Sequence, residues 1–220
     1  MTVRARGFTL IEMLLAVSLV ALIMIMAYSG LEASIKMADS GEAFIDRSSR
    51  ARITHEFLRK QLGRLLPLSF QQDGGKNITF EGESERVRFV GPMPGYLGRG
   101  GAYVQELYFA RGNQGSVLNY RFHMLNGFDE DKFEQVEPVA LLEGVARGNF
   151  SFRSVDPQGK LKDWSGDWED GQSVPLMVRL DLEMTPESRL KVPQLVVAMV
   201  VDANVARTTP RFSNSTAVAR

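Results

Sequence analysis

Glu12 is the side chain with the clearest chemical requirement, because this carboxylate stands at the head of a long apolar run. It is the only ionised residue between Phe8 and Tyr28. A charged carboxylate carried into lipid costs a few kcal/mol, so such residues generally have a cationic partner or a function. At the membrane interface, headgroup water would solvate the carboxylate instead. The position therefore indicates either a buried ion pair or a carboxylate at the membrane surface.

The other residues that could do chemistry show no catalytic arrangement. His55 and His123 have no nucleophile or metal-spaced partner near them in the sequence, and no serine lies in a Gly-x-Ser-x-Gly motif. The string Gly98-Arg99-Gly100-Gly101 lacks the Lys-Ser/Thr signature of a phosphate-binding loop. We therefore predict that the protein is not an enzyme and has no cofactor.

Two acidic segments come nearest to a metal site, since calcium prefers oxygen ligands. Neither has the spacing of a helix-loop-helix calcium site. Their members are Asp129, Glu130 and Asp131 in the first, and Asp163, Asp167, Glu169 and Asp170 in the second. Solvated acidic loops are commoner than calcium sites, so we expect no required metal.

The element that must position Glu12 is an apolar helix long enough to cross a membrane. The 21 residues from Phe8 to Tyr28 would rise about 31 Å as a helix, which matches a hydrocarbon core of about 30 Å. Arg4 and Arg6 precede the run with no acidic residue beside them. The positive-inside rule then places the N-terminus in the cytoplasm and the chain beyond about residue 36 on the far side.

Three interpretations of this stretch remain possible. It could be a plain membrane anchor, or a cleaved secretory signal with small residues near Ala27 and Ser29. Both leave Glu12 unexplained. The third rests on the whole string Arg6-Gly7-Phe8-Thr9-Leu10-Ile11-Glu12, which resembles the N-terminus of type IV pilin-like precursors, the prepilins and pseudopilins.

This resemblance implies a processing site and a role for the carboxylate. In that family a membrane-embedded prepilin peptidase cuts after the glycine, here Gly7, and methylates the new N-terminal residue, here Phe8. Glu12 would then be the fifth residue of the mature chain, paired with a Phe8 amine of its own or a neighbouring subunit. A buried pair adds little net stability, but breaking it leaves an unpaired charge. The pair is therefore better suited to fixing the axial register of neighbouring subunits than to stabilising their association.

Bulk composition is consistent with one anchored domain, or at most two small ones. The 220 residues carry 26 basic and 26 acidic side chains. Loss of residues 1–7 removes Arg4 and Arg6 and leaves a net charge of −2, so nothing in the overall charge favours nucleic-acid binding. With no cysteine, the domain cannot use disulfides and must be stabilised by its core.

The helical pattern continues beyond the membrane over residues 31–66, where Pro67 is expected to end it. An apolar stripe at three- and four-residue spacing begins less regularly at Phe44 and Ile45 and continues through Phe57, Leu58, Leu62, Leu65 and Leu66. Gly30 and Gly41 are candidate points for a bend. The other faces are mainly basic, which favours a solvated surface, with contact to acidic neighbours in a filament as the alternative: Arg47, Arg50, Arg52, Arg59, Lys60 and Arg64.

After Pro67 the pattern changes to short strands and turns. We expect about seven antiparallel strands, over residues 86–90, 104–110, 117–124, 139–142, 149–155, 176–184 and 195–201. The last is uniformly apolar and would be buried on both sides, under the long helix. Residues 91–101 and 128–134 are expected to be loops. The fold class is therefore α+β, with a long N-terminal helix packed on an antiparallel β-sheet domain.

A second resemblance lies in the C-terminal half. Asp163-Trp164, Trp168 and the string from Val174 to Leu180 are similar to the minor pseudopilin J family of type II secretion, in which paired tryptophans precede a Pro-x-x-Val-Arg strand. The other possible role of the two tryptophans is packing in the core or at its rim.

That resemblance implies a structural subunit of the bacterial inner membrane, at or near the tip of a periplasmic pseudopilus. The implied partners are minor pseudopilins I and K, then H and the major pseudopilin, together with the prepilin peptidase, the inner-membrane platform and membrane lipid. The family starts fibre assembly and helps to export folded exoproteins. The alternatives are a minor type IV pilin for adhesion, motility or DNA uptake, and a membrane-anchored periplasmic binding protein.

The expected organisation follows from these features. Residues 1–7 form a leader, 8–30 a transmembrane and assembly helix, and 31–66 its amphipathic continuation. Residues 67–207 form a periplasmic antiparallel β domain, and 208–220 a polar tail.

Overall fold

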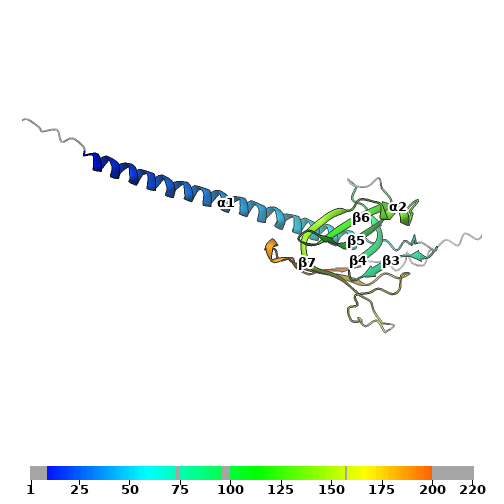
Figure 1. Cartoon of the computed structure of the whole chain (residues 1–220). Helices are drawn as coiled ribbons and strands as arrows, with labels where there is room; N and C mark the ends of the chain where they lie inside the picture. Colours follow the sequence, from blue (N-terminus) through cyan, green and yellow to red (C-terminus); the bar gives the residue numbers. More distant parts are fainter. Residues whose placement is uncertain (1–8, 73–74, 96–99, 157, 200–220) are drawn as a thin grey trace, which may run out of the picture. The chain divides into compact units, whose positions relative to one another are not determined.

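A computed structural model describes residues 9–72, 75–95, 100–156 and 158–199. The proposed leader with Gly7, the residue Phe8 and the tail 208–220 lie outside the described residues. The described chain forms one long helix, α1 (Leu10–Leu62), followed by a β domain (Figure 1). It divides into two compact units, one ending at Arg47 and the other beginning at Ser48. The expected α+β class is therefore confirmed.

The start of α1 is specified by Thr9 and Glu12. The Glu12 amide donates to the Thr9 carbonyl oxygen at 3.1 Å and also lies 3.4 Å from Thr9 Oγ1. A threonine followed three residues later by a glutamate is the sequence of a capping box. The helix then continues through Gly30 and Gly41 without interruption.

The end of α1 comes four residues earlier than Pro67 and the apolar stripe led us to expect. After Leu62 the backbone bonds tighten to three-residue spacing, as in Leu65 N–H to Leu62 O at 3.3 Å. The Leu66 amide then donates to Val90 O at 2.8 Å, in the sheet. Because a residue before proline is disfavoured in helical conformation, Leu66 pairs with a strand instead.

Nine strands are formed by the described residues. Seven of them make one antiparallel sheet whose spatial order equals the sequence order, β3-β4-β5-β6-β7-β8-β9. Their bounds are β3 (Phe80–Glu83), β4 (Arg86–Pro92), β5 (Ala102–Gly112), β6 (Gly115–Met124), β7 (Val139–Arg153), β8 (Met177–Met184) and β9 (Leu195–Ala198). The short strands β1 (Phe70–Gln71) and β2 (Asn77–Ile78) pair separately.

The sheet buries one face against the last turns of α1. Leu58 and Leu62 of the helix belong to the same core as Phe89, Phe150 and Leu180 of the sheet. Thr54 Oγ1 also donates to Leu141 O at 2.9 Å, which ties the helix to β7. The predicted stripe is confirmed over this part of the helix. Its earlier members Phe44 and Ile45 are exposed, because they precede the part of α1 that packs in the second unit.

The opposite face of β4 and β5 is covered by a second, smaller cluster. It contains Val90 and Val104 from the sheet, Phe70 and Ile78 from β1 and β2, and Phe133. Phe133 lies on the short helix α2 (Glu130–Glu134). Residues 128–134 were expected to be a loop, and this was wrong because the side chain of Asp129 caps α2 by accepting from Lys132 N–H at 3.1 Å.

Strand β7 joins two strands that were expected separately. The register of its pairing shifts near Leu118 of β6 and again between Val145 and Arg147. Gly144 lies in this region with φ 71°, a conformation that favours glycine. A β-bulge changes which side chains face the core without ending the strand, so the sequence pattern breaks although the strand does not.

Strand β9 is an edge strand, not a strand buried on both sides as expected. Its side chains alternate, with Leu195 and Val197 buried and Val196 37% exposed. Only one face is covered, because Leu195 and Val197 join the core that contains Leu58 and Leu62 while Val196 points to the other side. Its place at the end of the sheet order leaves one backbone edge without a partner strand in this sheet. The single-turn 3₁₀ helix η1 (Pro186–Ser188) lies in the connection that leads into it.

Candidate functional site

The N-terminal assembly segment is described from Thr9 onward, so Gly7 and Phe8 lie outside the described residues. Glu12 is exposed in the first turn of α1. A carboxylate there is favoured by the positive end of the helix dipole, in addition to the proposed pairing with an amine. Sequence reasoning found Glu12 but overlooked that Thr9, three residues earlier, accepts from the Glu12 amide at the start of the helix.

The apolar run behind Glu12 has no cover from the rest of the described chain. Every large apolar side chain from Leu10 to Met26 is at least 51% exposed. By length and composition α1 is able to cross a membrane, and it is the one described helix that meets this test. Such exposure in water is unfavourable at about 25 cal/mol per Å², so this segment requires lipid or the helices of other subunits.

The two histidines lie on different elements of the second unit. His123 is on the sheet face opposite Tyr120, with Nδ1 2.9 Å from Met124 O and its ring against Phe128. His55 is half-buried on α1, and burial, followed by the charge of Arg59, lowers its pKa below the usual value. No group of three or more potential metal ligands gathers among the described residues.

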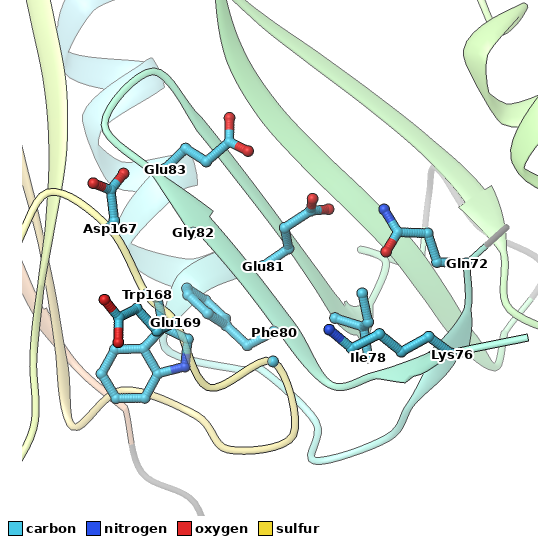
Figure 2. Close-up of a pocket in the computed structure, with 11 residues that line it drawn as sticks. Gln72, Lys76, Ile78, Phe80, Glu81, Gly82, Glu83, Asp167, Trp168 and Glu169 are labelled. Carbon is cyan, nitrogen blue, oxygen red and sulfur yellow. The ribbon is translucent and has the colours of Figure 1, made fainter. Parts of the chain in front are cut away.

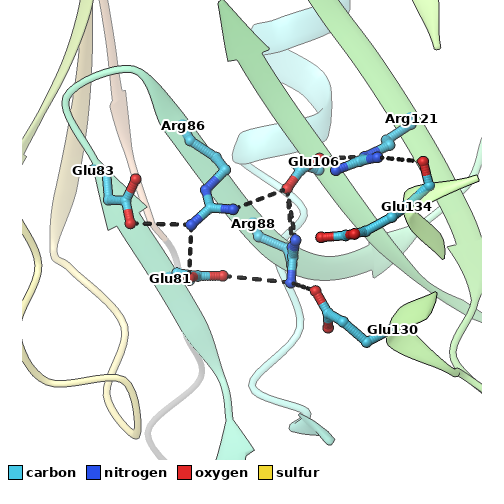
Figure 3. A network of polar contacts seen from close by, with 8 residues as sticks. All are labelled: Glu81, Glu83, Arg86, Arg88, Glu106, Arg121, Glu130 and Glu134. Atoms are coloured by element: carbon cyan, nitrogen blue, oxygen red, sulfur yellow. Dashed lines mark hydrogen bonds and ion pairs between the residues drawn. The ribbon is translucent and has the colours of Figure 1, made fainter. Parts of the chain in front are cut away.

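A buried charge network is the main polar feature of the β domain, and sequence reasoning did not find it (Figure 3). Arg88 is 1% exposed and donates through Nε and Nη2 to Glu106, which is fully buried, at 3.1 and 2.8 Å. Its Nη1 donates to Glu130 of α2 at 2.6 Å. Arg121 donates to the other oxygen of Glu106 and to the backbone of Glu134.

Aromatic rings close this network from water. The Arg88 guanidinium lies 5.9 Å from the Phe70 ring centre and 5.2 Å from that of Phe133, and Arg121 lies 4.8 Å from Phe133. Burial acts to lower the pKa of Arg88, but Glu106, then Glu81 and Glu130, raise it above its usual value. The charged form is therefore maintained, and α2 is fastened to the sheet through Glu130.

The acidic segment at residues 129–131 is thus structural in the described chain. Asp129 caps α2, and its bond from the Lys132 backbone lowers its pKa. Glu130 pairs with Arg88. In the second acidic segment, the Asp170 carboxylate accepts from the Gln172 backbone at 3.2 Å, and the hydrogen bonds of Ser173 and Gln172 lower its pKa.

Trp168 packs against the edge strand β3 beside an open acidic cleft of about 350 Å³ (Figure 2). Its ring meets Phe80 edge to face at 6.4 Å, and Nε1 donates to Ser173 O at 3.1 Å. Backbone pairing of Trp168 with Gly82 covers the outer edge of β3. The carboxylates of Glu81, Glu83 and Asp167 line the cleft, but Arg86 pairs with the first two.

Trp164 has a different role at the surface. The Arg179 guanidinium lies 4.6 Å from its ring centre and that of Arg153 lies 5.5 Å away. Arg179 also bonds Ser151 Oγ at 3.2 Å and pairs with Asp181 at 2.9 Å. The tryptophan and arginine that carried the second resemblance are therefore in contact. This stacked group fastens the segment after β7 to strands β7 and β8.

The arginines in the first half of the β domain lie in different surroundings. Arg88 is buried, and Arg86 is engaged by Glu81 and Glu83. Arg99 lies outside the described residues. Arg111 is exposed in β5.

The described chain combines a long, exposed apolar helix at its N-terminal end with a seven-stranded antiparallel sheet. This arrangement is typical of a pilin-like protein, and comparisons with known proteins support the same class. Residues 3–28 match the model of the prokaryotic N-terminal methylation motif. The chain is 35% identical over 183 residues to the type II secretion system protein J of Xanthomonas campestris pv. campestris, covering 81% of this chain and 87% of that protein. The chain therefore belongs to the type II secretion system protein J family, the minor pseudopilins J, and is anchored in a membrane.

A solved structure also matches. In the GspK-GspI-GspJ complex from the type 2 secretion system of enterotoxigenic Escherichia coli, one chain is 17% identical, with a TM-score of 0.47. The match covers 69% of this chain and 96% of that chain.

Proposed function

We propose that this minor pseudopilin is a non-enzymatic subunit at or near the tip of the periplasmic pseudopilus, where it starts fibre assembly and helps to export folded exoproteins. Its identity to protein J over most of both chains is the observation that carries this proposal. In the related solved complex, the proteins named are GspK, GspI and GspJ. We take the corresponding pseudopilins I and K as partners, with H and the major pseudopilin below them.

The proposed membrane arrangement follows from the N-terminal sequence. Arg4 and Arg6 keep the N-terminus in the cytoplasm, and the β domain stands in the periplasm. Prepilin peptidase cuts between Gly7 and Phe8 and methylates the Phe8 amine. The motif match over residues 3–28 supports this processing.

The non-enzymatic role is supported by how the polar side chains of the described residues are used. Arg88 and Glu106 hold α2, and Arg179 supports Trp164. These groups bond to one another and do not converge on an open cleft. Movement of the fibre then depends on the inner-membrane platform and not on chemistry in this chain.

Glu12 is proposed to fix the register of the assembled helices by pairing with a Phe8 amine. We predict that Glu12→Ala is inserted and cleaved normally but enters the fibre poorly, because the amine loses its partner. Glu12→Gln is the informative control, since it retains a capping residue but not the charge. Loss of assembly in both variants supports the ion pair. Normal assembly of Glu12→Gln would mean that Glu12 acts only as a cap.

Deletion of the gene tests the function as a whole. Exoprotein in the medium and pili on the surface would be scored on the same cells, with the gene restored on a plasmid as the control. We expect secretion to fail and pili to remain. Loss of pili with normal secretion would instead make the protein a minor type IV pilin, and a normal phenotype for both would favour an anchored receptor.

A further inference from the structure

A groove of about 510 Å³ lies within the second unit, between α1 and the segment that precedes β9. Its apolar lining comes from Ala51 on the helix and from Leu190, Val192 and Pro193 on the opposite wall. None of these side chains belongs to the fully buried core, although Ala51 and Val192 pack against it. The groove is therefore an apolar depression on the surface of the domain.

The rim of the groove is basic. Arg52 and Lys191 stand on opposite walls, and both are exposed. Glu56 is the one acidic residue among the lining residues, and Arg59 follows one turn later on α1. The charge around the groove is thus positive, which complements an anionic group on the occupant.

His55 is a polar residue in the lining of the groove. Its Nε2 atom is buried and meets no partner at good hydrogen-bond geometry among the described residues. The Gln194 backbone does interact with the ring and raises its pKa, but less than burial and Arg59 lower it. A polar group on the occupant would give Nε2 a well-aligned partner.

The apolar lining and the basic rim are adjacent on both walls. Val192 follows Lys191 on one wall, and Ala51 precedes Arg52 on the other. An apolar centre with a polar rim is the usual pattern of a protein interface. The arrangement fits a partner segment in which apolar side chains flank a carboxylate.

We propose that this groove receives an acidic, apolar-flanked segment of a neighbouring pilin-like subunit in the fibre. The partner carboxylate pairs with Arg52 and Lys191, an adjacent polar group bonds to His55 Nε2, and apolar side chains cover Val192 and Pro193. This inference rests on the proposed function, since it assigns the contact surface of a fibre subunit. Beyond that function, it identifies the binding site on this chain and the chemistry of the partner segment.

Photo-crosslinking in cells tests the proposal on the full chain. A photoreactive amino acid replaces Val192 in the otherwise native protein, and adducts are identified by mass spectrometry. We expect an adduct to another fibre subunit, at a peptide that contains Asp or Glu. The double variant Arg52→Glu with Lys191→Glu should lower the adduct yield about tenfold or more, equal to at least about 1.4 kcal/mol.

The matched control reverses two charges elsewhere on the surface. Lys160→Glu with Lys162→Glu changes the net charge equally and should leave the adduct yield unchanged, since both lysines are exposed outside the groove. Equal abundance of the two double variants in the membrane fraction checks that both fold. An equal fall in yield in both would mean that net charge alone is responsible, and would overturn the proposal.

Three other crosslinking results would also overturn the groove proposal. Crosslinking only to phospholipid, only to a second copy of this chain, or to no molecule would show that no other fibre subunit occupies the groove. Failure of the groove is distinguishable from failure of the proposed function. If gene deletion abolishes secretion while the Arg52→Glu, Lys191→Glu variant secretes and crosslinks normally, only the groove proposal is wrong.

Discussion

Arg88 is held by more carboxylates than its own charge requires. Glu106, Glu130 and Glu81 all lie within 3.6 Å of its guanidinium, and Arg86 and Arg121 balance the excess. Desolvation makes a buried ion pair a weak source of net stability. Loss of one member is different, because the remaining charges stay buried without compensation.

We predict that Arg88→Met destabilises the β domain by about 3–5 kcal/mol. The change leaves Glu130 without its cation and removes the ion pair that fastens α2. The measurement is thermal unfolding of the full chain in detergent, followed by circular dichroism. Lys132→Met is the control, since Lys132 pairs with Asp129 at the surface and a surface pair contributes about 0–1 kcal/mol. Equal unfolding midpoints for the two variants would contradict the structural role of the network.

A pH dependence is expected from Tyr120. Burial raises the pKa of this phenol, and its hydroxyl donates to Gln105 Oε1 at 2.9 Å. Below a pH of about 10 both the folded and the unfolded chain hold the proton. Above it the unfolded chain loses its proton first, so the free energy of unfolding falls as the pH rises.

The check is to measure unfolding midpoints between neutral and strongly alkaline pH. Tyr120→Phe should be less stable at neutral pH by about 1–3 kcal/mol, because Gln105 loses a partner. The same variant should lose less of its stability above pH ~10. Parallel pH curves for the variant and the native chain would show that other groups dominate alkaline unfolding.

At the scale of residues, the sequence identified the core but not its charges. Alternation in the strand expected over residues 86–90 puts Val87 and Phe89 on one face, and both are buried. The same alternation would make Arg88, between them, face solvent. The alternation is real, but β1, β2 and α2 cover the opposite face as well. A single-sequence pattern describes which face a residue lies on and not what later covers it.

At the scale of elements, the predicted boundaries were wrong where local hydrogen bonds or β-bulges override the hydrophobic pattern of the sequence. Helix α2 was missed because its acidic residues were interpreted as a loop, although Asp129 is a favourable helix N-cap. Strand β7 was divided because its bulges interrupt the alternation. The hairpin of β5 and β6 was predicted well, since neither strand contains a bulge and a short turn joins them.

Gly148 in β7 gives an element-scale prediction. A Cβ atom there would lie 2.2 Å from the ring of Phe109, which packs against Phe150. Gly148→Ala must displace that ring and should destabilise the domain by about 1–3 kcal/mol, measured by thermal unfolding. Gly166→Ala is the matched control, because its nearest neighbour would be at an ordinary 3.7 Å. A larger effect at Gly166 would contradict the packing described here.

At the scale of the molecule, the two units on either side of Arg47 need different surroundings. The first unit exposes the apolar run of α1, while Leu58 and Leu62 in the second complete the core of the sheet. We predict that a fragment beginning at Met37 stays in solution without detergent and unfolds near the midpoint of the full chain. A fragment beginning at Gly63 should be much less stable, because losing each core leucine costs about 2–5 kcal/mol.

Sedimentation and thermal unfolding of the two fragments test this prediction. Aggregation of the Met37 fragment, or equal midpoints for both, would contradict it.

The general plan of a membrane helix followed by an antiparallel sheet could be predicted from the sequence, because it depends on long apolar periodicities. The edge position of β9 was not, since strand order is a property of the assembled sheet and leaves no mark on one strand.

The sequential order of the seven strands also has a consequence for how the chain is made. Each strand of the seven-stranded sheet pairs only with its neighbours in sequence. The loops that must close are therefore local, the longest being residues 154–176 between β7 and β8, and the entropic cost of closing a loop rises only slowly with its length. Topologies rich in such local contacts fold faster than those built from distant pairings. The sheet can therefore grow strand by strand in the order in which translation delivers it. The helix residues Leu58 and Leu62, which emerge first, then form the surface on which each new strand closes.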